Sequence, residues 1–104
     1  MHEIEDLFGD IVIFELPASE YLDAFRDRLR PAWGGWAEED GPVWLFAADL
    51  ATGGDLAVLL RAAQELLDEL GLEAIRFCLD GRVYVLESVR TASTYQQLVE
   101  AQGA

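Results

Sequence analysis

Two Asp-Gly pairs, Asp40-Gly41 and Asp80-Gly81, lie forty residues apart, and each stands between two runs of strand-forming residues. A two-residue type I′ turn needs positive φ at both central positions, which Asp and Gly tolerate better than most residues, so each pair predicts a β-hairpin. The hairpins are expected within residues 33–48 and 74–87. Two hairpins in so short a chain commit most of its strands to antiparallel pairing.

A segment with helical periodicity precedes each hairpin. Residues 18–30 place their apolar side chains on one stripe, and Pro31 is expected to end that helix. Residues 55–70 repeat leucine and alanine at a three-four spacing, with Asp55 available as N-cap and Gly71 as the C′ residue. Both segments therefore predict helices with one buried face.

Further elements are expected toward the two ends of the chain. Residues 11–16 form a nearly continuous apolar run rich in β-branched side chains, which is typical of a central strand covered on both faces. Residues 1–10 are an acidic lead-in. In residues 91–104, a capping box of Ser93 and Gln96 predicts a short C-terminal helix followed by a tail.

The expected order is β-α-β-β-α-β-β over a single α+β domain, residues 1–104. This order resembles the ferredoxin-like split βαβ plan, with one extra strand hairpinned onto the last. The resemblance implies an antiparallel-rich five-stranded sheet with two main helices on one face, to which the capping box adds the short C-terminal helix. It implies no particular function, because this architecture hosts many.

The charge balance is strongly acidic: 20 Asp and Glu residues against seven basic ones, all of them arginine, give a net charge of −13. A GC-rich genome or a salty habitat can produce this composition, and acidic excess also keeps small proteins soluble. Alternatively, the negative potential steers the protein to a basic partner. Direct nucleic-acid binding is disfavoured, because phosphates require clustered Lys or Arg.

The lack of recognisable targeting signals predicts a cytoplasmic location. No apolar run approaches the roughly 20 residues of a membrane span, and the N-terminus is acidic where a secretory signal is basic. The single cysteine, Cys78, excludes an internal disulfide and fits a reducing compartment.

The first hairpin holds all three tryptophans. A turn centred on Asp40-Gly41 predicts that Trp33 and Trp44 share one face of the sheet, with Trp36 on the other. Both faces of residues 11–14 and of strand 43–48 are then apolar, although helices can cover only one face of the sheet. The second face is therefore expected to meet a second copy of the chain, a partner or the terminal segments.

Residues that would support catalysis are sparse. The single histidine, His2, is close to the N-terminus, and Cys78 lies within a predicted strand, where a small hydrophobe is the usual role. The chain lacks zinc-ligand spacing and the alternating ligands of a calcium loop. A catalytic role for an acid pair such as Asp49 with Asp55 is left as an alternative, but no enzyme activity, metal or cofactor is expected.

The sequence thus predicts an acidic protein-binding domain, most concretely an inhibitor or neutraliser of a basic partner protein, of the immunity, antitoxin or nucleic-acid-mimic kind. One alternative is a homodimeric regulatory domain that binds a small ligand in an apolar pocket against the sheet. A weaker alternative is a cofactor-independent enzyme that uses carboxylates. The candidate partner-binding residues are Trp33, Trp36, Glu38, Glu39, Asp40 and Trp44.

Overall fold

The computed structural model describes residues 11–90, which form a five-stranded antiparallel sheet and three helices. The strands are β1 (Ile11–Leu16), β2 (Trp36–Asp40), β3 (Val43–Asp49), β4 (Ala74–Leu79) and β5 (Arg82–Glu87). The helices are α2 (Ser19–Trp33), α3 (Leu50–Gly53) and α4 (Leu56–Leu70). The expected acidic lead-in (1–10) and short C-terminal helix (91–104) lie outside the described residues.

The strand order is β2-β3-β1-β4-β5, so the first strand is the centre of the sheet and each hairpin flanks it on one side. This arrangement confirms the expected α+β class and is consistent with a ferredoxin-like plan. The fifth strand extends the sheet beyond β4, to which it is joined by the second hairpin.

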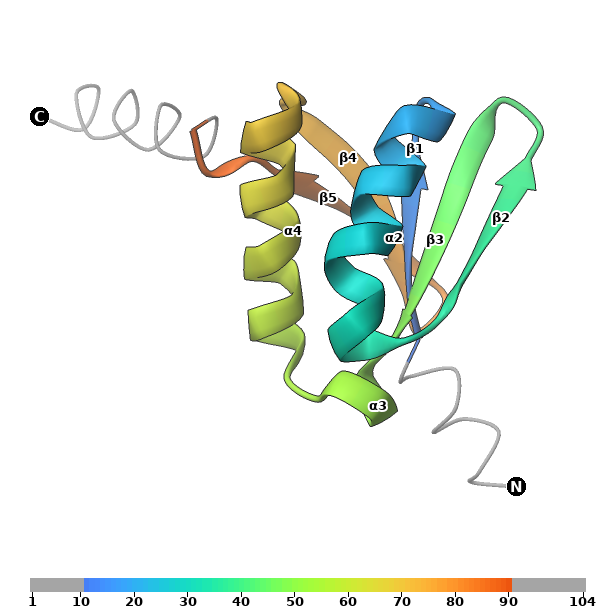
Figure 1. Cartoon of the computed structure of the whole chain (residues 1–104), viewed down its shortest axis with the longest axis vertical. Coiled ribbons are helices and arrows are strands. Elements are labelled where there is room, and N and C mark those ends of the chain that lie inside the picture. Colours follow the sequence, from blue (N-terminus) through green and yellow to red (C-terminus); the bar gives the residue numbers. More distant parts are fainter. Residues whose placement is uncertain (1–10, 91–104) are drawn as a thin grey trace, which may run out of the picture.

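The two long helices lie side by side on the same face of the sheet (Figure 1). Phe14 of β1 is fully buried beneath them, and its ring centroid lies 5.5 Å from that of Phe25 on α2 and 6.0 Å from that of Phe77 on β4. From α4, Leu59 and Leu67 complete this layer without exposure to solvent. Burial of such side chains contributes about 1.5–3 kcal/mol each relative to exposure, so the core is built between the helices and this face.

The boundaries of α4 confirm the sequence expectation. The Asp55 carboxylate accepts a hydrogen bond of 2.8 Å from the N–H of Ala57, and Gly71 adopts the left-handed conformation with φ of 75°. The N–H of Leu72 then donates to the carbonyl of Leu67 at 2.9 Å. These are the polar contacts that satisfy helix ends.

Helix α2 continues through Pro31 to Trp33, so the expected end at Pro31 is wrong. A proline removes one helical hydrogen bond and opposes continuation. Here the last turn is held by other contacts: the Gly34 N–H donates to the Arg30 carbonyl at 2.7 Å, and the Trp33 indole N–H donates to the Gly54 carbonyl at 3.2 Å. Trp33 therefore belongs to a helix and not to the first hairpin.

The second hairpin has the expected turn. Asp80 and Gly81 have φ of 53° and 75°, as a type I′ turn requires, and Leu79 pairs with Arg82.

The first hairpin turns one residue later than expected, at Gly41-Pro42, and Asp40 pairs with Val43. A turn centred on Asp40-Gly41 would make Pro42 the residue that closes the hairpin with an N–H, which proline lacks. With Gly41 at φ of 60° and Pro42 next to it, the turn follows the type II′ pattern, which has Gly at the first central position.

Candidate functional site

The face of the sheet opposite α2 and α4, hereafter the open face, carries a row of apolar side chains that crosses every strand. In the observed register Trp36 pairs with Ala47, Ala47 with Ile13, Ile13 with Cys78, and Cys78 with Val83. We call these five residues the apolar row. At its two ends Trp36 is 52% exposed and Val83 is 59% exposed, although side chains of this kind are usually buried.

A depression of about 480 Å³ lies at one end of the open face. Its described lining consists of Ile11, Ile13, Trp36, Cys78, Asp80 and Gly81. Asp80 carries the one charged side chain in that lining. The depression therefore suits an apolar group more than a strongly polar one.

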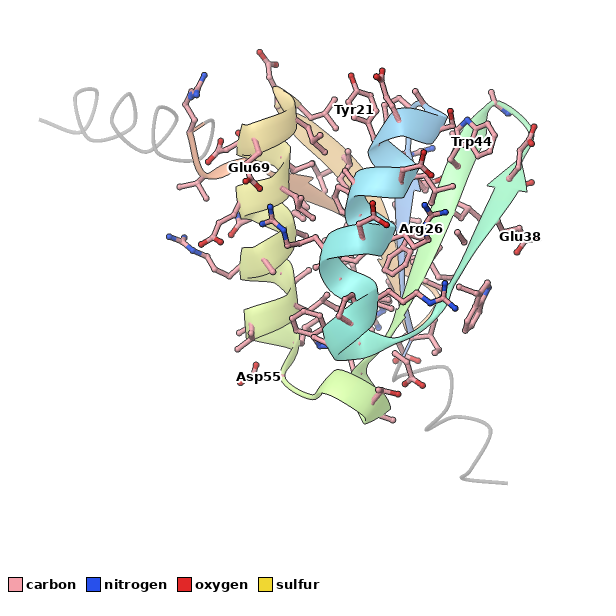
Figure 2. All side chains as sticks on the ribbon, in the orientation of Figure 1. Tyr21, Arg26, Glu38, Trp44, Asp55 and Glu69 are labelled. Atoms are coloured by element: carbon pink, nitrogen blue, oxygen red, sulfur yellow. The ribbon has the colours of Figure 1, made fainter. Side chains whose placement is uncertain are left out.

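Three consecutive acidic residues, Glu38, Glu39 and Asp40, form what we call the acidic tip of the β2–β3 hairpin. All three are exposed, and within residues 11–90 none of them forms an ion pair. The labelled Glu38 in Figure 2 lies on β2, away from both long helices. Glu38 and Asp40 are on the open face with Leu45 and Val43, and Glu39 is on the other face.

Carboxylates outside the acidic tip form ion pairs with arginines. Glu69, labelled on α4 in Figure 2, forms an ion pair of 3.0 Å with Arg28 of α2. On the open face, Arg76 of β4 contacts Glu15 of β1 at 2.9 Å. The local negative charge of the hairpin is thus left without a counterion in the described part of the chain, whereas the helical layer and the centre of the open face have partial compensation.

The structure divides the expected partner-binding residues into two groups. Trp36 and the acidic tip lie at the surface. Trp33 is only 6% exposed within the core, and Trp44 is half-buried and packs against the same core from the helical side of β3. The expectation that Trp36 lies on the opposite side from Trp33 and Trp44 is confirmed, although Trp33 reaches that side from a helix.

No member of the apolar row other than Trp36 was predicted from the sequence as a partner-binding residue. In the second hairpin, Arg76, Cys78, Val83 and Val85 share the open face, as the alternation of side chains along a strand requires. What the pattern did not indicate is that Val83 and Trp36 lie at opposite ends of one row, because that requires the strand order.

Two of the catalytic candidates, Asp49 and Asp55, are helix caps. The Asp49 carboxylate accepts hydrogen bonds from the Ala51 N–H at 2.9 Å and the Thr52 hydroxyl at 3.3 Å, and so caps α3 as Asp55 caps α4. Cys78 is a free thiol that is partly exposed on the open face rather than buried. His2 falls outside the described residues. Within residues 11–90, no cluster of three or more His, Cys, Asp or Glu side chains is arranged to hold a metal ion.

The chain matches no family model, no curated protein and no solved structure. None of the helices between residues 11 and 90 is long and apolar enough to cross a membrane. The fold and surface define a small α+β domain with helices on one face of its sheet and an apolar row beside an acidic hairpin on the other.

Proposed function

We propose that this chain is a non-enzymatic protein-binding domain whose open face covers a basic surface of a partner protein and neutralises it. The proposed class is an inhibitor of the immunity, antitoxin or nucleic-acid-mimic kind, acting in the cytoplasm. The observation that carries the proposal is the position of an exposed tryptophan directly beside carboxylates without counterions: Trp36 and Glu38 are both on the open face of the same edge strand.

The tryptophan and the carboxylates contribute to different aspects of binding, namely affinity and association rate. A large aromatic side chain that becomes fully desolvated often dominates affinity, with truncation costing 2 kcal/mol or more. Trp36 is the tryptophan exposed enough to act in this way. The carboxylates of Glu38 and Asp40 lie on the same face and would raise the association rate with a positively charged partner.

The same features describe the partner. A surface rich in arginine or lysine can place a cation over the indole face of Trp36 while its neighbours meet the acidic tip. An apolar group at the centre of that surface can enter the depression lined by Ile13 and Cys78. The partner is therefore expected to be a basic protein with an apolar or aromatic centre, such as a nuclease or toxin encoded next to this gene.

Affinity capture from the source cells tests the proposal with three baits: the unchanged chain, Trp36→Ala and Val58→Ala. Val58 is a matched control because it is 55% exposed on α4, in the helical layer rather than on the open face. A captured basic protein is then purified, and its affinity for each bait is measured by calorimetry. Trp36→Ala is expected to weaken binding by at least about 30-fold, and Val58→Ala by less than about threefold.

The reversal of charge at Glu38 gives a second readout. Glu38→Arg should slow association with the same partner, because it replaces an attractive charge by a repulsive one. A captured protein that is not basic, or one that binds Trp36→Ala as tightly as the unchanged chain, would contradict the proposal.

A second candidate is favoured by the depression itself. Its volume of about 480 Å³ is within the range of small-molecule sites, and its described lining is mostly apolar. A small apolar ligand held there would co-purify with the protein and be released by denaturation. Native mass spectrometry before and after denaturation detects such a ligand, and Ile13→Asp should abolish its retention.

A further inference from the structure

The two edges of the sheet differ in how they resist pairing with another strand. Edge strands expose unpaired backbone groups, and charged side chains on them usually prevent association. The β2 edge ends in the acidic tip. The β5 edge instead carries Val83, Tyr84 and Val85, which are 59%, 41% and 65% exposed, and contains no acidic residue between its turn and Glu87. The charged residues of this strand, Arg82 and Glu87, are at its two ends, so the middle of the β5 edge lacks the usual protection.

The hydrogen-bond phase of β5 shows which backbone groups point away from the sheet. Ser88 donates its N–H to the Glu73 carbonyl at 2.8 Å, directly beyond the paired strands. Backbone groups that point inward and outward alternate along an antiparallel strand. The N–H and C=O groups of residues 82, 84 and 86 therefore also point toward β4. The N–H and C=O groups of Val83, Val85 and Glu87 point outward.

Helix α4 occupies one end of this outward edge. The side-chain amide of Gln64 donates a hydrogen bond of 3.0 Å to the Glu87 carbonyl. In the described part of the chain, the outward groups of Val83 and Val85 have no such partner. The accessible edge is thus the half of β5 nearest the Asp80-Gly81 turn.

We propose that β5 pairs with β5 of a second copy of this chain, antiparallel and about a twofold axis that passes through Tyr84. This register places Val83 of each copy opposite Val85 of the other. Four backbone hydrogen bonds then satisfy all the outward groups of these two valines, and the Glu87 carbonyl keeps its bond to Gln64. A twofold axis at Val85 would instead place Val83 opposite Glu87, whose carbonyl is already bonded.

The side chains support the same register. The four valines, two from each copy, gather on the open face at the centre of a ten-stranded sheet. On the helical side, the two Tyr84 rings face each other across the axis, each already stacked on Phe77 of its own chain at a centroid distance of 5.3 Å. Cross-strand aromatic and β-branched pairs are among the favourable ones in sheets.

The charge distribution favours this edge for association between two chains of net charge −13. The acidic tips are on β2, at the opposite edge of each sheet, and nine strand spacings separate the two β2 strands in the pair. At about 4.8 Å per spacing this is roughly 43 Å, several times the screening length of about 8 Å at physiological salt. The strongest local concentrations of charge therefore do not repel each other.

Proline substitutions test the backbone contribution. Val85→Pro removes an outward N–H and leaves the β4–β5 ladder intact, so the dimer should weaken by on the order of tenfold or more, since each copy loses one bond. Glu39→Pro is the matched control: Asp40 closes its hairpin with Val43, so the N–H of Glu39 points outward at the β2 edge. Sedimentation equilibrium measures both dimer constants, and circular dichroism verifies folding.

Cross-linking tests the register and does not depend on the proline variant. In a Cys78→Ala background, Tyr84→Cys places two thiols on the axis at a Cα separation suited to a disulfide. Val85→Cys in the same background places them two residues apart along the strands, and it should form little disulfide under the same mild oxidation. A monomer at all concentrations, equal cross-linking of the two variants, or an unchanged dimer for Val85→Pro would overturn the inference. These results are independent of partner binding by Trp36.

Discussion

At the scale of single residues, Trp33 connects the first helix to the loop before α4. Its indole contacts Gly53 so closely that a Cβ built on Gly53 would lie 2.3 Å from Trp33 Cδ1 and 2.6 Å from the Ala32 carbonyl oxygen. Gly35 is similarly constrained, since its Cβ would lie 1.7 Å from the Ala47 carbonyl. Gly53 and Gly35 are thus explained by close approach of neighbouring segments, which no local sequence pattern indicates.

Gly53→Ala is expected to destabilise the fold by about 1–3 kcal/mol, because a methyl group must displace the Trp33 ring or the backbone of α2. Urea denaturation followed by near-ultraviolet circular dichroism measures this loss. In a Trp33→Leu background the same substitution should cost less, because the ring that it meets is gone. Equal losses in both backgrounds would show that the contact does not account for the glycine.

The exposed and buried tryptophans should also differ in what they contribute to stability. Trp33→Ala removes a buried ring and its hydrogen bond to the Gly54 carbonyl, and should reduce the free energy of unfolding by about 3–5 kcal/mol. Trp36→Ala removes a side chain that is half-exposed and should change it by less than about 1 kcal/mol. Guanidinium denaturation of both variants makes the comparison, and similar losses would contradict the assigned environments.

At the scale of elements, local signals predicted α4 correctly and misplaced the first hairpin. Asp55 and Gly71 fix the two ends of α4 through hydrogen bonds made within a few residues, so the local sequence is enough to predict both ends. The first hairpin turns at Gly41-Pro42 because Pro42 has no N–H with which to close a turn at Asp40-Gly41, and this outweighs the Asp-Gly preference. The end of α2 depends on Trp33 packing against residues twenty positions away, which explains why Pro31 was misleading.

The two Asp-Gly pairs should therefore respond differently to a β-branched residue. Asp80 has φ of 53°, so Asp80→Val should cost at least about 1 kcal/mol. Asp40 lies in β2 without positive φ, and Asp40→Val should be neutral or slightly stabilising. Thermal unfolding of the two variants distinguishes them, and a large loss for Asp40→Val would place the first turn where the Asp-Gly signal alone predicts it.

The position of each strand in the sheet could not be read from its residues. The segments 43–46 and 83–86 align in sequence and suggest a weak repeat. In the structure β3 is an inner strand beside β1, whereas β5 is an edge strand. Similar apolar strands thus have different exposure, because strand order is decided by pairing between distant segments. This is why the exposed tryptophan was correctly oriented from the sequence while the exposed valines of β5 were not recognised as a surface.

At the scale of the whole molecule, negative charge and apolar surface are arranged so that two kinds of association can coexist. The acidic tip and Trp36 are at the β2 edge, and the unprotected backbone of β5 is at the other. Self-pairing through β5 would leave both β2 edges free, with one copy of the open face on each side of the axis. A symmetric pair would then present two partner sites on one continuous sheet.

These two associations are expected to depend on salt in opposite directions, because one joins like charges and the other joins unlike charges. Raising the ionic strength from about 0.05 to 0.5 M shortens the screening length from roughly 14 to 4 Å, which weakens the repulsion between chains of net charge −13. The dimer should therefore tighten, since backbone hydrogen bonds and valine burial are little affected. Binding of a basic partner should weaken over the same range, because its steering by Glu38 and Asp40 is screened. Sedimentation equilibrium for the dimer and stopped-flow association rates for the partner measure the two slopes. If dimerisation also weakened with salt, opposite charges rather than the β5 edge would hold the copies together.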